Sequence, residues 1–154
     1  MVAAGRIDRA ERLIAAPAAR LFGYWTDPAL LLRWLPPRGM AGRVEQFDPR
    51  PCGAFRIVLT YDDPGRAGHA GDGSDVVAAR FLAVEPPRHL AFASRFESDD
   101  PQMQGEMRMD WHFDPEGAAT RVRVVASNVP PGIRAGDHAA GMASSLAQLA
   151  ALVE

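Results

Sequence analysis

One histidine near the C-terminus, His138, stands where a segment rich in proline and glycine gives way to a helical pattern. It precedes Met142 by four residues, and Met142 opens an apolar series at helical spacing. The two side chains therefore share one helix face, which we expect to point at the core. A neutral imidazole there can bond a ligand or act as a base. His138 is the candidate catalytic residue, but no second catalytic group can be placed beside it, so an exposed histidine without a function is the simpler alternative.

Two hydroxyl groups, those of Tyr61 and Ser94, interrupt strand-like segments whose alternate positions are otherwise apolar. Tyr61 shares a face with Phe55, and Ser94 shares a face with Phe92. A hydroxyl buried on such a face needs a hydrogen-bond partner. A neighbouring backbone group is the favoured partner. A ligand is the alternative, which makes both residues candidates for ligand binding.

The segment MRMDWHF (residues 107–113) alternates apolar and polar residues, as a strand covered on one side does. Asp110 and His112 fall on its polar face. In residue type they resemble an acid–base pair. Because we expect that face to meet solvent, we do not count them as catalytic candidates.

Methionine and tryptophan side chains gather on the inward positions, with Trp25 assigned to the core. Methionine adapts its shape to irregular ligands, so these positions suit a wide and soft lining. The alternative is that they only fill the core, as aromatic and methionine stripes usually do. Besides Tyr61, Ser94 and His138, the side chains expected to contact a ligand are Trp34, Met107, Met109, Trp111 and Met142.

Motifs for metal or cofactor chemistry are missing from the sequence. The four histidines, at positions 69, 89, 112 and 138, are scattered, and none has a histidine or cysteine partner at the spacing of a metal motif. The aspartates near prolines and glycines are ordinary turn residues, without the order of an EF-hand loop. There is no G-x-S-x-G elbow and no Walker loop. We therefore expect no metal site and no cofactor.

Composition and charge favour a single globular domain and argue against nucleic-acid partners and lysine chemistry. The 154 residues are 47% hydrophobic, which suits one globular domain over residues 1–154. A formal net charge of −2 without a basic patch argues against nucleic-acid binding. All 17 basic residues are arginines, so lysine Schiff-base chemistry is excluded.

The single cysteine, Cys52, cannot form an intramolecular disulfide, which favours a cytoplasmic location. We expect it to be a small buried residue rather than a nucleophile. No apolar run reaches the roughly 20 residues of a membrane span, so we expect no membrane partner.

The hydrophobic period divides the chain into elements. A helical pattern follows Pro17, and a second short helix follows Asp27, a typical N-cap residue with Pro28 in the first turn. A long helix ends the chain, with Asp137 as its candidate cap. Short loops between the strands predict an antiparallel meander. Strands are expected at residues 6–14, 43–47, 54–61, 76–84, 89–96, 103–113 and 120–127.

Four features follow one another along the chain: a helix pair with WTDP and WLPP, the strand start DPRPCGAF, the turn VEPPRHLAF and a final helix opening at Gly141. In this order the chain resembles the START/SRPBCC helix-grip superfamily, and within it the Hsp90-ATPase-activator-like (AHSA1-type) branch. Many members carry Gly-Gly where this chain has Cys52-Gly53. The resemblance implies an α+β helix-grip fold (Bet v 1/START-like), in which a curved antiparallel sheet of about seven strands wraps around a long C-terminal helix. It also implies an apolar cavity between sheet and helix.

Three functions follow from this resemblance, and one fold hosts many functions. The favoured one is binding of a small apolar or aromatic ligand in the cavity, without catalysis. An enzyme of the aromatic polyketide cyclase type is the alternative, with His138, Tyr61 and Ser94 as candidates. A chaperone (Hsp90) cofactor is the third and is less expected, because the additional N-terminal domain of eukaryotic activators is missing from the sequence. A homodimer is compatible with the fold.

Overall fold

The computed structural model describes residues 6–36, 39–61, 74–96 and 99–154. Within these residues, seven strands, three α-helices and a short 3-10 helix follow one another. They are β1 (Asp8–Ile14), α1 (Ala18–Thr26), α2 (Pro28–Leu31), β2 (Met40–Phe47), β3 (Ala54–Tyr61), β4 (Ser74–Glu85), β5 (His89–Phe96), η1 (Pro101–Met103), β6 (Met107–Glu116), β7 (Ala119–Ser127) and α3 (Ala135–Val153).

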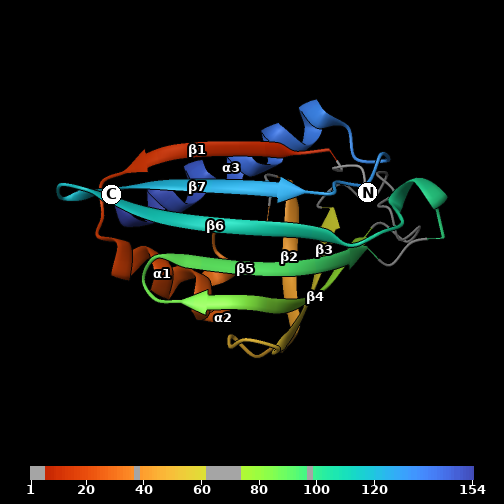
Figure 1. Ribbon diagram of the computed structural model, residues 1–154, viewed down its shortest axis with the longest axis horizontal. Coiled ribbons are helices and arrows are strands. Elements are labelled where there is room, and N and C mark those ends of the chain that lie inside the picture. Colours follow the sequence, from red (N-terminus) through yellow and green to blue (C-terminus); the bar gives the residue numbers. More distant parts are fainter. Residues whose placement is uncertain (1–5, 37–38, 62–73, 97–98) are drawn as a thin grey trace, which may run out of the picture.

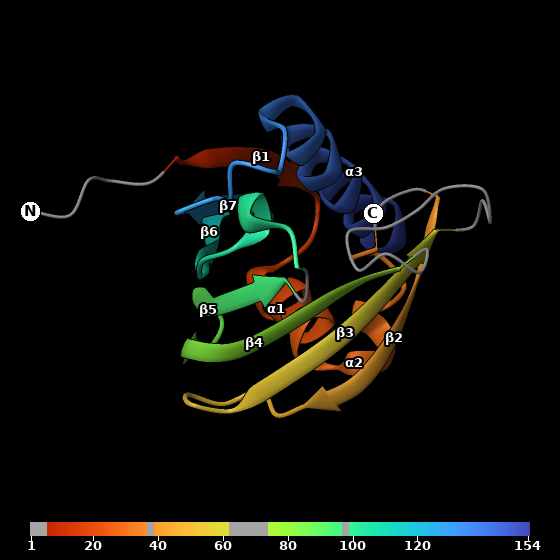
Figure 2. The same cartoon turned by 90° about the vertical axis from the view of Figure 1, so that its right-hand side faces the viewer.

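The strands form a single antiparallel sheet in the order β1-β7-β6-β5-β4-β3-β2. From β2 to β7 each strand pairs with the next one along the chain, and β1 joins the far edge beside β7. Figure 1 shows α3 behind this sheet, and Figure 2 shows the sheet curling around α1 and α2 while α3 lies beside β1. The predicted α+β helix-grip fold is confirmed.

Local chemistry explains the two short helices. The Asp27 carboxylate accepts hydrogen bonds from the backbone N–H groups of Ala29 and Leu30, at 3.0 and 3.4 Å. Pro28 occupies the first turn of α2, where a missing N–H costs nothing. Both features agree with the sequence prediction.

The final helix begins earlier than its sequence suggested. It starts at Ala135, with Arg134 as its N-cap residue and no side-chain cap hydrogen bond. The predicted cap at Asp137 is therefore wrong, since Asp137 lies inside the first turn. The predicted opening at Gly141 is also wrong, because Gly141 lies within the helix.

Two other expectations need correction. The strand predicted from Met103 starts only at Met107, because Met103 ends the 3-10 helix η1, which the Asp100 side chain caps. Cys52, predicted to be buried, is exposed. It lies in the loop between β2 and β3 with a φ of 69°, a left-handed conformation that favours glycine.

Aromatic rings fill the centre of the core around Trp25, which is fully buried. Edge-to-face and tilted contacts of this kind stabilise a core beyond the area that they bury. Five rings have centroids between 5.4 and 6.3 Å from that of Trp25: those of Trp34, Phe55, Phe81, Phe92 and Trp111.

Hydrogen bonds hold α3 to the segment after α2. Ser145 donates to the carbonyl of Leu35 at 2.7 Å, and the Gln148 amide donates to the carbonyls of Trp34 and Pro36 at 2.8 Å. These bonds fix the helix over the open side of the curved sheet. Within the described residues, every helix is too short or too polar to cross a membrane.

Candidate functional site

The inward side chains predicted to contact a ligand lie in or beside the core. Trp34, Met107, Trp111 and Met142 are at most 5% exposed. Met109 is only half-buried, although it faces Phe92 across β5 and β6. The structure thus brings the predicted apolar set to the inner surface and leaves one member accessible to solvent.

The two predicted hydroxyl groups lie at different depths. Ser94 is 1% exposed, and its Oγ donates to the Met107 carbonyl at 3.5 Å, the outer limit of a hydrogen bond. Tyr61 is half-buried at the end of β3. The backbone partner that the sequence favoured for Ser94 is therefore present, and the bond is weak.

The three tryptophans differ in how their indole N–H groups are satisfied. Trp34 Nε1 donates to the Tyr24 carbonyl at 3.0 Å. The Nε1 atoms of Trp25 and Trp111 are buried and have no hydrogen-bond partner within the described parts of the chain. A buried donor left without an acceptor costs about 1–3 kcal/mol. The two indole rings that carry these donors are in edge-to-face contact, with centroids 5.8 Å apart.

Part of the inner surface stays accessible. Val77 and Ala79 on β4 lie opposite the buried Ile57 and Phe55, yet both are only half-buried. Opposite residues in a ladder share a face, so these apolar side chains point inward and still meet solvent. Met109 on β6 is likewise half-buried, and we refer to these three accessible inward side chains together as the open end.

His138 is positioned by a hydrogen bond with Asp8 of β1. Its Nδ1 lies 2.8 Å from Asp8 Oδ2, and the two side chains are 14% and 8% exposed. Arg6 also binds the Asp8 carboxylate, through two nitrogens at 3.0 and 3.2 Å. Burial acts to raise the pKa of Asp8, but the hydrogen bonds from His138 and Arg6 outweigh it and hold that pKa below its usual value.

Asp8, Arg6 and His138 therefore form a network that links the edge strand to the first turn of α3. His138 lies on the α3 side that meets β1, and its place at the end of a ligand cavity stays a prediction. One of its nitrogens is committed to Asp8.

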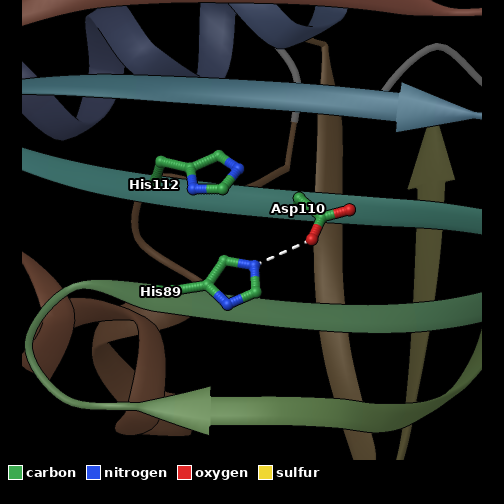
Figure 3. Close-up of side chains that lie close together, drawn as sticks. All are labelled: His89, Asp110 and His112. Atoms are coloured by element: carbon green, nitrogen blue, oxygen red, sulfur yellow. Dashed lines mark hydrogen bonds and ion pairs between the residues drawn. The ribbon is translucent and has the colours of Figure 1, made fainter.

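The outer face of β5 and β6 carries a polar cluster of His89, Asp110 and His112 (Figure 3). His89 Nε2 lies 2.7 Å from Asp110 Oδ1, and the two imidazole rings stack with centroids 4.8 Å apart. Burial acts to raise the pKa of Asp110, but hydrogen bonds from Arg108 and His89 outweigh it and lower that pKa. Burial first, and then the charges of His89 and Arg123, lower the pKa of His112.

The sequence placed Asp110 and His112 correctly on the face away from the core but did not join them to His89. Motif spacing detects ligands that are close along the chain, whereas these histidines meet through strand pairing. The usable signal is the outward position of His89 in its own strand, combined with a register that pairs it with His112.

Comparisons with known proteins give one consistent result. The family model for Activator of Hsp90 ATPase homolog 1-like protein matches residues 15–154. A solved protein from Chromobacterium violaceum is 28% identical, with 96% of each chain covered and a TM-score of 0.84. The AHSA1 protein from Silicibacter pomeroyi, 24% identical over 96% of each chain, has a TM-score of 0.76 and is similar in fold. A comparison with curated protein sequences finds no match.

Proposed function

The chain belongs to the family of Activator of Hsp90 ATPase homolog 1-like proteins, and on this premise we propose that it binds a small apolar or aromatic molecule bearing a hydrogen-bond acceptor. The ligand occupies the interior between the sheet and α3. Its acceptor takes the indole N–H groups of Trp25 and Trp111, and its apolar part packs against the inner surface at the open end.

The observation that carries this proposal is the pair of buried indole N–H groups for which the described residues supply no acceptor. Buried donors in folded proteins are almost always paired with protein, water or ligand. A ligand oxygen that reaches these donors, after the surrounding side chains have moved to admit it, would satisfy them and remove the cost of leaving them unpaired. The neighbouring rings of Trp34 and Phe92 favour an aromatic or aliphatic body beside that oxygen.

The open end supports a route for the ligand. Val77, Ala79 and Met109 are inward and apolar but half-buried, so a ligand that reaches them displaces water from apolar surface. Met109 is the most adaptable of the three, since its unbranched side chain changes shape at low cost.

Ligand binding needs no proton transfer, whereas the enzyme alternative needs an acid or base that meets the substrate. Ser94 donates to a backbone carbonyl at 3.5 Å. Asp8 holds His138 through Nδ1 and leaves Nε2 available, an arrangement that also orients catalytic histidines. His138 therefore stays the candidate base of the enzyme alternative.

Matched probes test the proposal. Acetophenone and ethylbenzene have the same aromatic ring and similar size, but only acetophenone has an acceptor oxygen. We expect the protein to bind acetophenone about 3- to 10-fold more tightly in calorimetric titrations, as one or two net hydrogen bonds predict.

Three tryptophan variants locate the source of that preference. Trp25→Phe and Trp111→Phe each remove one unpaired indole N–H, and each should reduce the preference for acetophenone. Trp34→Phe is the matched control, because its N–H is already bonded to Tyr24, and it should keep the preference. Equal affinity for the two probes in the wild-type protein, or an unchanged preference in both Trp25→Phe and Trp111→Phe, would refute the proposal.

The family description names the ATPase of Hsp90, which keeps a chaperone-cofactor role as the second candidate. That role predicts Hsp90 binding through surface residues, unaffected by Trp25→Phe and Trp111→Phe in a pull-down. A cytoplasmic location and a homodimer stay predictions from the sequence.

A further inference from the structure

A second arrangement, on the outer face of the sheet, is independent of the interior. The register of β5 and β6 sets His89 directly opposite His112. Asp110 is on the same strand as His112 with one residue between them, so the three side chains project from one face. Their candidate ligand atoms all lie within 4.8 Å of one another. We propose that His89, Asp110 and His112 bind a divalent cation of the zinc class on this face.

The ligand types and their spacing suit this cation. Zn²⁺ binds imidazole nitrogen and carboxylate oxygen, whereas calcium and magnesium need more oxygen ligands. Tetrahedral zinc bonds of about 2.0–2.1 Å set ligand atoms about 3.3 Å apart. The strand register holds the three backbone positions, and the two imidazoles must rotate out of their present stacked arrangement to direct their nitrogens at one cation. Solvent can supply the fourth ligand, since the His89 and Asp110 side chains are 20% and 15% exposed.

Glu85 supplies the outer support that metal-binding histidines usually have. Its Oε1 lies 2.7 Å from His89 Nδ1, while His89 Nε2 points at Asp110. A histidine that binds a metal through one nitrogen commonly donates its other N–H to a carboxylate, which fixes the ring orientation. Glu85 and His89 have this relation, with Nε2 left as the ligand atom.

Binding exchanges a hydrogen bond for the cation. His89 Nε2 and Asp110 Oδ1 lie 2.7 Å apart. A histidine binds a metal ion through an unprotonated nitrogen, so the proton of this hydrogen bond leaves to solvent when the cation binds. The Asp110 carboxylate then binds the cation in place of the His89 N–H.

Two arginines next to the proposed ligands carry positive charges that repel a cation. Arg108 binds the Asp110 carboxylate through two nitrogens at 2.9 and 3.1 Å. Arg123 lies opposite His112 in the β6–β7 register and pairs with Asp114. Their positive charges weaken cation binding, so removal of Arg108 should strengthen it. If these residues form the site, removal of a ligand should weaken Zn²⁺ binding and removal of Arg108 should strengthen it.

Titration of the untagged chain with ZnCl₂, followed by calorimetry, tests the proposal. We expect one Zn²⁺ per chain and no saturable binding of Mg²⁺. His89→Ala and His112→Ala should each weaken Zn²⁺ binding more than Glu85→Gln, for which a loss of about 10-fold is expected. Circular dichroism of each variant establishes that it is folded.

A charge-matched pair of variants separates a specific site from general attraction. Arg108→Gln frees Asp110 and should tighten Zn²⁺ binding about 30-fold, as loss of a unit charge about 4 Å from a divalent cation in water predicts. Arg95→Gln makes the same charge change on β5, where Arg95 pairs with Glu106, and should leave Zn²⁺ affinity unchanged. The proposal is overturned if the wild-type chain shows no saturable binding of Zn²⁺, or if folded His89→Ala and His112→Ala variants bind it as the wild type does.

Discussion

The inner and outer faces of β5 and β6 are built from alternating residues of the same two strands, yet they leave their polar groups in opposite conditions. On the inner face Leu90 and Trp111 pack into the core, and the Trp111 N–H has no acceptor within the described residues. On the outer face His89 and Asp110 are each bonded to charged partners. The same strand pairing therefore leaves the Trp111 N–H without an acceptor from the described residues on the inner face, whereas His89 and Asp110 both have hydrogen-bond partners on the outer face.

This difference shows two physical routes to a binding site. The inner face has donors that gain a partner when a ligand arrives, so the gain comes from bonds not yet made. The outer face has ligand atoms that already have partners, so a cation must compete with a proton and two arginines. Selective binding inside is governed by acceptor geometry, and binding outside is governed by charge.

The largest expected contrast is between two neighbours on β6. Trp111→Ala opens a cavity in the aromatic core and should lower the free energy of unfolding by about 3–5 kcal/mol. His112→Ala, one residue away on the outer face, should lower it by less than about 1 kcal/mol. Urea unfolding of both variants measures the difference. Similar losses in the two variants would contradict the assignment of faces.

The inner side of the sheet is mostly apolar, and Asp8 is the exception. It is the only buried side chain with a charge among the described residues, so substitution of Asp8 shows how much a buried charge contributes there. Asp8→Asn weakens its bonds to Arg6 and His138 and should cost about 2 kcal/mol, as for hydrogen bonds to charged groups. The pKa of Asp8 is lowered by folding, so its contribution is complete above the unfolded value of about 3.9. That contribution is lost as the pH falls through the lower folded pKa.

Chemical unfolding at a series of pH values checks this prediction. Wild-type stability should fall below about pH 4 more steeply than that of Asp8→Asn, because the variant lacks one of the titrating carboxylates. Asp110 also has a lowered pKa, so some acid sensitivity should remain in the variant. Parallel acid limbs for the two proteins would show that the Asp8 network contributes nothing.

The smallest expected effect belongs to a half-exposed ion pair on the outer face. Arg123 and Asp114 lie 2.9 Å apart, with side chains 43% and 48% exposed. Solvent screens such a pair, so Arg123→Gln should change the free energy of unfolding by about 0.5 kcal/mol or less. A loss above 2 kcal/mol in urea unfolding would mean that outer-face charges stabilise the sheet as strongly as inner-face packing.

Local pattern was enough to predict most of the fold. The strands at residues 54–61 and 89–96 have the predicted bounds, and the alternation in residues 107–113 separates the two faces as expected. Alternation is a property of neighbouring residues, so it can be read without knowledge of the partner strand. Asp27 and Pro28 likewise carry their own signal for the start of a helix.

The sequence predictions are wrong or incomplete where neighbouring residues carry no signal for the structure. Arg134 begins α3 without a side-chain cap, so the nearest aspartate was a misleading marker. Cys52 takes a left-handed backbone that residue type alone does not reveal. The meeting of His89 with His112 depends on strand register, which the intervening turn and 3-10 helix leave open.

The central claim, that the unpaired indole N–H groups receive a ligand acceptor, is tested most directly by NMR of the tryptophan Nε1–H signals. Saturating acetophenone should move the Trp25 and Trp111 proton signals downfield, as formation of a hydrogen bond requires, and should leave Trp34 nearly unmoved. Ethylbenzene should shift none of the three downfield. The account is contradicted if acetophenone leaves the Trp25 and Trp111 signals in place, or if it moves all three tryptophans alike.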